Sequence, residues 1–204
     1  MSSKKNKPSL RDDKPSTSWN LYVNNIQDYV HVQQVFSKEE CEKIIKIAET
    51  KRLLKATTKS KEDDTYRKSQ ICWLYSSDDM EWAFRKVTDI ILDLNNKFFQ
   101  FDIFGLNEGF QFTNYKSPDG TYRSHVDTIF GHVVRKLSLT IQLTDPKEYE
   151  GGELYIYNDE NGTVMEKQQG SLTMFPSYTL HKVTTVTKGE RNSLVCWVTG
   201  KQFK

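Results

Sequence analysis

The second half of the chain alternates short apolar segments with turn signals, and this pattern limits the possible folds more than any other feature. From Phe101 onward, segments of about five to eight residues are rich in aromatic and β-branched side chains, which favour strands. Turn-forming sequences separate these segments, namely Ser117-Pro118-Asp119-Gly120, Gly151-Gly152, Asn161-Gly162 and Lys188-Gly189. The pattern predicts an all-β second half made of many short, antiparallel strands.

Two amphipathic helices are predicted in the first half of the chain. Ser37 and Glu40 form a capping-box pattern, and apolar residues recur at helical spacing after it, so we expect a helix over about residues 38–53. A short strand is expected over residues 70–74. A second helix over about residues 78–98 carries one apolar stripe, formed by Met80, Phe84, Val87, Ile91, Leu94 and Phe98. Both helices are expected to pack against a core.

The order of these elements predicts a mainly β protein with supporting N-terminal helices, an α+β fold of the β-sandwich or jelly-roll type. The 204 residues are enough to bury one sizeable core. We therefore expect one domain over residues 18–204, with helical support over about 18–98 and a β core over about 99–204. Residues 1–17 are rich in Lys, Ser, Pro and Asp and are expected to form a disordered or peripheral arm.

Charge and cysteine content narrow the range of partners and compartments. The 29 Lys and Arg residues balance 27 Asp and Glu residues, which argues against a nucleic-acid partner and gives no support for a membrane surface. Cys41, Cys72 and Cys196 lie far apart in the sequence, so neither a disulfide framework nor a zinc ribbon is predicted. With no apolar leader and no run of about 18 apolar residues, the sequence predicts a soluble, cytoplasmic protein.

His125 and Asp127 form an HxD pair that is suited to metal binding. On a strand, both side chains would point to one face while Val126 packs on the other. A site of two histidines and one carboxylate on one face of an octahedron is typical of non-haem Fe(II), with open positions for substrate and oxygen. An isolated HxD pair is weak support for a metal site, because a surface pair on an edge strand gives the same sequence.

A second histidine must come from elsewhere among the 4 histidines of the chain. His181 follows a turn at Pro176 and precedes another apolar stretch, which is the context of a late strand that returns beside an earlier one. His132 lies in a glycine-containing segment and His31 in an early apolar segment, and neither has a comparable context. His181 is therefore the favoured ligand.

Arg191 supplies a second unusual feature, because it shares one face of a predicted strand with Ser193, Val195 and Trp197. An arginine that points inward needs an anion, since an unpaired buried guanidinium is costly. A carboxylate matches the guanidinium in geometry, and it can come from a protein Asp or Glu or from a small acid cofactor. With 2-oxoglutarate as that cofactor, its 2-oxo acid end would chelate the iron.

These segments together resemble the Fe(II)- and 2-oxoglutarate-dependent dioxygenases, specifically the prolyl 4-hydroxylase-like group that includes bacterial and phage PKHD-type hydroxylases. The likeness covers roughly residues 96–200. Its matching segments are SPDGTYRSHVD, RKLSLTIQLTDPKEYEGGELYIY and GSLTMFPSYTLHKVTTVTKGERNSLVCWVTG. The resemblance implies a double-stranded β-helix, a cupin-like jelly roll, in which Gly151-Gly152 begins an inner strand.

The resemblance also assigns roles to individual residues and implies Fe(II), 2-oxoglutarate and O2 as cofactors, while leaving a requirement for ascorbate open. The implied metal ligands are His125, Asp127 and His181. The implied contacts to the distal carboxylate of 2-oxoglutarate are Arg191, Tyr115 and Ser193. Tyr122, Arg67 and Trp73 are candidate substrate contacts, and residues 55–69 form a candidate lid; core packing and a plain surface loop are the alternatives.

The sequence thus predicts an enzyme that hydroxylates its substrate and releases succinate and CO2. Family analogy favours a proline-containing peptide or protein substrate. Asp127 favours hydroxylation, because halogenating relatives lack a ligating residue at that position. The alternatives are an oxygenase acting on a small molecule or nucleobase, and a non-catalytic jelly-roll binding module that holds a metal. A zinc hydrolase with the same three ligands would leave Arg191 unexplained.

Overall fold

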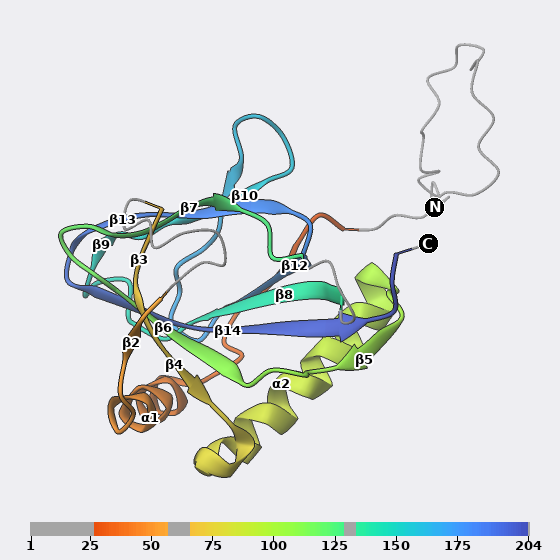
Figure 1. Ribbon diagram of the computed structural model, residues 1–204, viewed down its shortest axis with the longest axis horizontal. Helices are drawn as coiled ribbons and strands as arrows, with labels where there is room; N and C mark the ends of the chain where they lie inside the picture. Colours follow the sequence, from red (N-terminus) through yellow and green to blue (C-terminus); the bar gives the residue numbers. More distant parts are fainter. Residues whose placement is uncertain (1–26, 57–65, 129–133, 204) are drawn as a thin grey trace, which may run out of the picture.

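The computed structural model describes residues 27–56, 66–128 and 134–203. Two antiparallel sheets face each other, and the helices lie against the outer side of the larger sheet (Figure 1). This is the jelly-roll arrangement of the predicted mainly β, α+β class, so the predicted fold class is confirmed. The predicted arm over residues 1–17 lies outside the described residues.

The larger sheet contains eight strands among the described residues. In spatial order they are β1 (Val30–Val32), β12 (Leu172–Pro176), β8 (Val134–Gln142), β14 (Glu190–Gly200), β6 (Phe110–Lys116), β4 (Gln70–Leu74) and β2 (Leu54–Lys55), with β5 (Ile103–Gly105) paired to β14. The central strand β14 is 11 residues long, which exceeds the predicted length, because it pairs with β8 and β6 along most of its course.

The smaller sheet contains six strands among the described residues. Their order is β11 (Thr163–Val164), β10 (Leu154–Tyr157), β13 (Leu180–Lys188), β7 (Gly120–His125) and β3 (Arg67–Lys68), with β9 (Glu150–Gly151) paired to β13. The loop predicted over residues 55–69 is wrong at its ends, because Lys55 belongs to β2 and pairs with β4, and β3 lies within the predicted range and pairs with β7. Residues 57–65 of that loop lie outside the described part of the chain.

Helix α1 (Lys38–Glu49) begins with the predicted capping box. The Ser37 hydroxyl accepts from the Glu40 amide at 3.2 Å, and the Glu40 carboxylate accepts from the Ser37 amide at 2.7 Å. The helix ends before the predicted residue 53, because the Thr50 hydroxyl donates to the Ile47 carbonyl at 2.7 Å and closes the last turn.

The second helical segment is more irregular than the sequence predicted. It consists of η1 (Ser76–Met80), α2 (Glu81–Leu94) and η2 (Asn95–Phe99), of which η1 and η2 are π-helical turns. The prediction of a regular helix from residue 78 is wrong, because Asp79 has a φ of 58° and the Asp78 carboxylate is held by the Tyr75 amide at 2.8 Å and by Lys51 at 2.6 Å. Within the described ranges, no helix combines the length and apolarity needed to cross a membrane.

Helix α2 docks on the larger sheet through an aromatic pair. Phe84 of α2 stacks on Phe110 of β6, with ring centroids 3.9 Å apart and an interplanar angle of 7°. Phe110 is fully buried. We expect Phe110→Ala to lower the free energy of unfolding by about 3–5 kcal/mol in urea denaturation, because it removes this contact and leaves a cavity.

Phe104 of β5 provides the matched control, since its side chain is 68% exposed. Phe104→Ala should change the free energy of unfolding by less than about 0.5 kcal/mol. Equal losses in the two variants would show that the aromatic pair does not hold α2 on the sheet.

Candidate functional site

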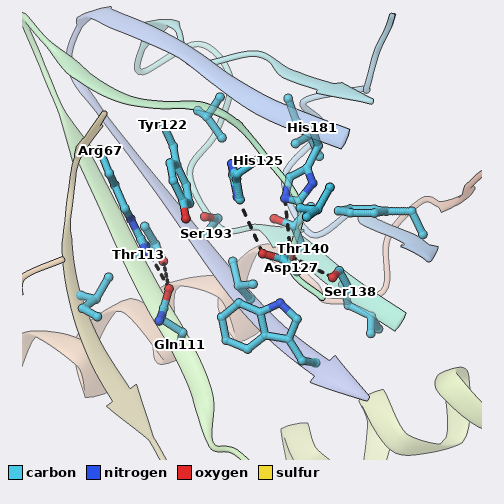
Figure 2. A pocket seen from close by; sticks show the side chains of 18 of the residues that line it. Arg67, Gln111, Thr113, Tyr122, His125, Asp127, Ser138, Thr140, His181 and Ser193 are labelled. Atoms are coloured by element: carbon cyan, nitrogen blue, oxygen red, sulfur yellow. Dashed lines mark hydrogen bonds and ion pairs between the residues drawn. The ribbon is translucent and has the colours of Figure 1, made fainter. Parts of the chain in front are cut away.

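A cavity of about 410 Å³ lies between the two sheets, and both sheets line it (Figure 2). The larger sheet contributes Tyr115, Ser138 and Arg191 to its wall. The smaller sheet contributes His125 and His181. The two regions that the sequence singled out, the HxD pair and the late arginine, therefore border one space.

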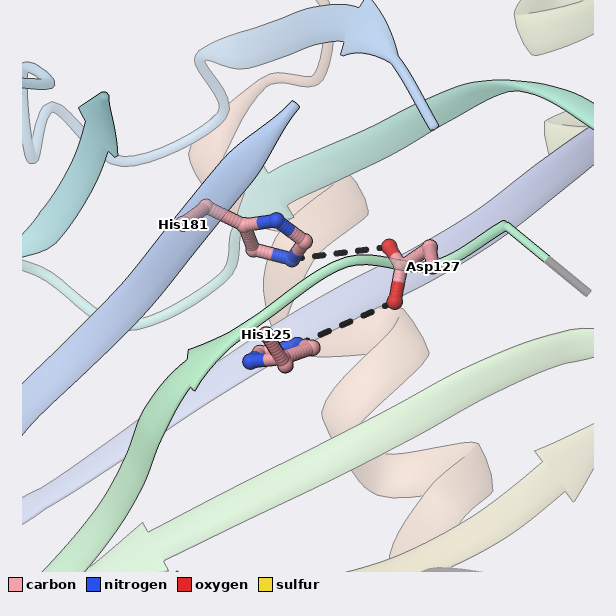
Figure 3. Close-up of side chains that lie close together, drawn as sticks. All are labelled: His125, Asp127 and His181. Atoms are coloured by element: carbon pink, nitrogen blue, oxygen red, sulfur yellow. Dashed lines mark ion pairs between the residues drawn. The ribbon is translucent and has the colours of Figure 1, made fainter. Parts of the chain in front are cut away.

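His125, Asp127 and His181 come together at this cavity (Figure 3). One ligand atom from each residue lies within 4.8 Å of the other two. Antiparallel pairing of β7 with β13 sets His125 directly opposite His181. The Asp127 carboxylate lies 3.7 Å from His125 Nε2 and 3.5 Å from His181 Nε2. The separation suits three groups that surround one ion.

Asp127 reaches the cluster by a route that the strand pattern did not predict. Strand β7 ends at His125, and the Asp127 amide donates to the Ser177 carbonyl at 2.9 Å. The Ser138 hydroxyl donates to Asp127 Oδ2 at 2.8 Å. Val126 is 47% exposed, so the prediction that it packs on the other side of a strand is wrong. Loop hydrogen bonds, and not strand alternation, aim this carboxylate.

Both imidazoles are oriented by backbone carbonyls. Nδ1 of His125 lies 2.7 Å from the Arg123 carbonyl, and Nδ1 of His181 lies 2.9 Å from the Thr179 carbonyl. A carbonyl only accepts, so each Nδ1 carries a proton and each Nε2 is the ring nitrogen that faces Asp127. A second partner of this kind is typical of metal-binding histidines.

The electrostatics of the cluster also suit a metal ion. Burial and the neighbouring His181 lower the pKa of His125 to about 4, so its imidazole is neutral near pH 7. Burial alone would raise the pKa of the Asp127 carboxyl, but His181 and His125 hold that pKa below its usual value. Two imidazole nitrogens and one carboxylate oxygen form the donor set that is typical of non-haem Fe(II).

Arg191 of β14 borders the same cavity as a buried cation. Its side chain is 1% exposed, and its Nη1 lies 3.5 Å from the Ser193 hydroxyl. Within the described residues, Arg191 forms no ion pair with a carboxylate, and its Nε has no hydrogen-bond partner. The Tyr115 ring centroid lies 5.4 Å from the guanidinium carbon. The site therefore fits an anion supplied from outside the chain, such as a small carboxylic acid.

The sequence of this region matches one family. A family model described as the 2OG-Fe(II) oxygenase superfamily matches residues 110–199, which include the whole histidine and aspartate cluster and Arg191. This matched region, which is less than half of the chain, is similar to the 2OG-Fe(II) oxygenase superfamily, as the sequence segments predicted. The group of cofactors that this family implies, Fe(II) with 2-oxoglutarate and O2, fits the donor set and the unpaired buried guanidinium.

The curated proteins that this chain resembles include PKHD-type hydroxylases. The chain is 37% identical over 94 residues to one from Nitrosomonas europaea, covering 43% of this chain and 40% of the relative. It is 41% identical over 78 residues to one from Parvibaculum lavamentivorans, covering 38% of this chain and 36% of the relative. The matched region thus spans less than half of these relatives.

Solved structures share the fold across most of the chain. A prolyl-4-hydroxylase from Pseudomonas putida has a TM-score of 0.69 at 20% identity and covers 86% of this chain and 94% of that chain. A Trichoplax adhaerens prolyl hydroxylase, in complex with a hypoxia inducible factor peptide fragment, has a TM-score of 0.72 at 14% identity and covers 85% of this chain and 84% of that chain. At these identities the likeness establishes the jelly-roll fold alone.

The three candidate substrate contacts, Tyr122, Arg67 and Trp73, all line the cavity, and Figure 2 shows Tyr122 and Arg67 side by side. Tyr122 stacks on His125 with ring centroids 3.5 Å apart. The Arg67 guanidinium lies 4.5 Å from the Tyr122 ring and donates to the Gln111 side chain at 3.0 Å. Trp73 lies on β4. The structure brings these side chains to the cavity, while the proposed lid role of the 55–69 loop falls largely on residues outside the described part.

Among the described residues, His31 is the one other histidine, and it lies apart from this cluster. His31 lies on β1, where its Nδ1 is 3.1 Å from the Thr173 hydroxyl and its Nε2 is 3.4 Å from the Glu166 carboxylate. His132 lies outside the described residues. The preference for His181 over His31 therefore agrees with the distances.

Sequence reasoning did not identify the hydroxyl groups that support the aspartate. Ser138 donates to Asp127 and lies 3.0 Å from the Ser177 hydroxyl, and both serines are buried. Ser138 stands in the apolar run Leu137-Ser138-Leu139 in the middle of β8. A buried hydroxyl in such a run needs a hydrogen-bond partner, so the polar residue within this apolar run could have indicated a supporting role for Ser138.

Proposed function

We propose that this protein is an Fe(II)- and 2-oxoglutarate-dependent dioxygenase that hydroxylates proline in a peptide or protein substrate. One observation carries the proposal. The three residues that could bind a metal line the same cavity as Arg191, a buried arginine with no carboxylate partner among the described residues. A structural metal site has no need of such an arginine. A small acid that chelates the metal at one end and pairs with Arg191 at the other accounts for both.

In this proposal the chain's own residues bind and orient the cofactors. His125, Asp127 and His181 would hold Fe(II), while Arg191, with Tyr115 and Ser193, would hold the distal carboxylate of 2-oxoglutarate. When bound, these cofactors supply an oxidation in which one atom of O2 enters a substrate C–H bond as hydroxyl and the other enters succinate as CO2 leaves.

Apolar side chains around the triad would exclude water from the reacting groups. Phe175 is 2% exposed and meets the His181 ring edge-on, with centroids 4.7 Å apart. Leu154 and Val183 are buried on the smaller-sheet side of the cavity. A dry wall beside the metal strengthens the electrostatic contacts made there and limits side reactions.

The proline-containing substrate is the finer part of the proposal. It is supported by the prolyl hydroxylases among the fold's relatives, one of which binds a peptide fragment. Tyr122, Arg67 and Trp73 would contact that substrate beside the metal. A small-molecule or nucleobase substrate, or a role as a non-catalytic metal-containing binding module, stands as the alternative. The cytoplasmic location and the use of ascorbate stay predictions.

Purified protein tests the proposal directly. We expect succinate from labelled 2-oxoglutarate when Fe(II), O2 and proline-containing peptides are present, and a mass gain of one oxygen on proline. The matched controls are peptides with alanine in place of each proline, and reactions with and without ascorbate. Formation of succinate without a modified peptide would support the dioxygenase but contradict a proline-containing substrate. An absence of succinate at high 2-oxoglutarate would overturn the dioxygenase itself.

A further inference from the structure

Tyr149 is a buried tyrosine beside Arg191 that the proposed reaction does not yet use. It lies just before β9, and its side chain is 3% exposed. Its hydroxyl makes no hydrogen bond to any residue that the structure describes, and the same holds for Arg191 Nε. An unpaired buried polar group costs stability, so two such groups that lie close together require an explanation.

Several observations bring Tyr149 and Arg191 together. Gly152 lies against both, since a Cβ atom there would be 2.9 Å from Arg191 Cδ and 3.4 Å from Tyr149 Cε2. Gly152 also has a φ of +66°, a conformation that favours glycine. Burial raises the pKa of the Tyr149 phenol, while the nearby positive charge of Arg191 lowers it. The phenol and the guanidinium are thus neighbours, and glycine leaves room for both.

The Tyr149 ring is fixed in this position by Lys167. The Lys167 ammonium lies 4.6 Å from the ring centroid. It also donates to the Gly151 carbonyl at 2.7 Å and pairs with Glu153 at 3.1 Å. The lysine therefore links the ring to the Gly151-Gly152 turn, beside Arg191.

We propose that Tyr149 is a positioning residue for the 2-oxoglutarate carboxylate site, which it serves by accepting a hydrogen bond from Arg191 Nε. The inference rests on the proposed function. A carboxylate that pairs with the outer nitrogens of Arg191 leaves Nε–H pointing back toward the protein. The Tyr149 oxygen is the acceptor at that side, and the hydrogen bond that forms when the carboxylate binds would fix the plane of the guanidinium. Without it, the fork can tilt and the carboxylate loses one of its paired contacts.

The test compares two ligands in the Tyr149→Phe variant. Titration calorimetry on Mn(II)-loaded protein measures the affinity for 2-oxoglutarate and for 2-oxobutyrate, which lacks the distal carboxylate. We expect about tenfold weaker binding of 2-oxoglutarate, as for a lost hydrogen bond to a charged group, and less than about twofold change for 2-oxobutyrate. In turnover, KM for 2-oxoglutarate should rise while kcat at saturation stays within about twofold. Tyr157→Phe, which removes a hydroxyl from the outer side of β10, should leave the affinity for both ligands unchanged.

The other outcomes are equally decisive. Unchanged affinity for 2-oxoglutarate in Tyr149→Phe, or an equal loss for both ligands, would overturn the inference and leave the dioxygenase proposal intact. Failure of the unmodified protein to bind 2-oxoglutarate would instead overturn the proposed function. In a protein that already carries Arg191→Gln, Tyr149→Phe should weaken 2-oxoglutarate binding further by less than about twofold, because Tyr149 acts through Arg191. A further tenfold loss of 2-oxoglutarate affinity in that double variant would mean that Tyr149 does not act through the arginine. If Tyr149→Phe does not fold, Tyr149→Met carries the same comparison.

Discussion

Asp127→Ala should abolish metal binding at the cavity and reduce 2-oxoglutarate turnover more than 100-fold. Loss of a hydrogen-bond partner of a ligand already costs about 10–100-fold in metal affinity, and Asp127 is itself the proposed ligand. It is also the single carboxylate of the cluster, so only the two imidazoles would remain. The fold should survive, because Ser138 keeps the Ser177 hydroxyl as a partner at 3.0 Å.

Thermal unfolding with and without Mn(II) provides the measurement. At a metal concentration of about 100 times Kd, binding stabilises the unmodified protein by about 2.7 kcal/mol, or roughly 5–10 °C in Tm. Asp127→Ala should show no metal-dependent shift. Asp93→Ala, a change at an exposed carboxylate paired with Lys97, should keep the full shift. A shift of normal size in Asp127→Ala would remove this aspartate from the metal site.

Local sequence patterns predicted those parts of the fold that depend on neighbouring residues. The strand expected over residues 70–74 is β4, Gln70–Leu74, and the capping box of Ser37 and Glu40 begins α1. The segment at Asp78 departed from its prediction, because a contact with Lys51 from another element competes with the helix start. Propensity and periodicity do not contain such contacts.

The site shows the same division between local and distant information. Residue types pointed to His125, Asp127 and His181 as candidate ligands, but the pairing of β7 with β13 that joins the two histidines is a long-range register. The sequence marked Arg191 as unusual through the face it shares with Trp197. It did not mark Tyr149, because a tyrosine before a glycine pair is compatible with ordinary packing, and only the fold brings its hydroxyl to Arg191.

Arg191→Met should have opposite effects on cofactor binding and on the stability of the cofactor-free protein. Truncating one partner of a buried charge pair costs about 2–5 kcal/mol of binding, so the affinity for 2-oxoglutarate should fall about 100-fold. In the absence of 2-oxoglutarate, however, the guanidinium is 1% exposed and has no carboxylate partner among the described residues. Replacing an uncompensated buried charge by an apolar side chain of similar length is often neutral or stabilising.

We therefore expect the free energy of unfolding of cofactor-free Arg191→Met to equal that of the unmodified protein or to exceed it by roughly 1–2 kcal/mol, after allowing for the lost contact with the Tyr115 ring. Urea denaturation measures this, and addition of 2-oxoglutarate with Mn(II) should stabilise the unmodified protein more than the variant. Arg191→Lys, which keeps the charge but not the planar fork, should bind 2-oxoglutarate with intermediate affinity. If Arg191→Met lost stability but bound 2-oxoglutarate with normal affinity, Arg191 would stabilise the protein core and would not bind the cofactor. The expected result would mean that the fold carries a buried charge whose cost is offset only when an acid enters the cavity.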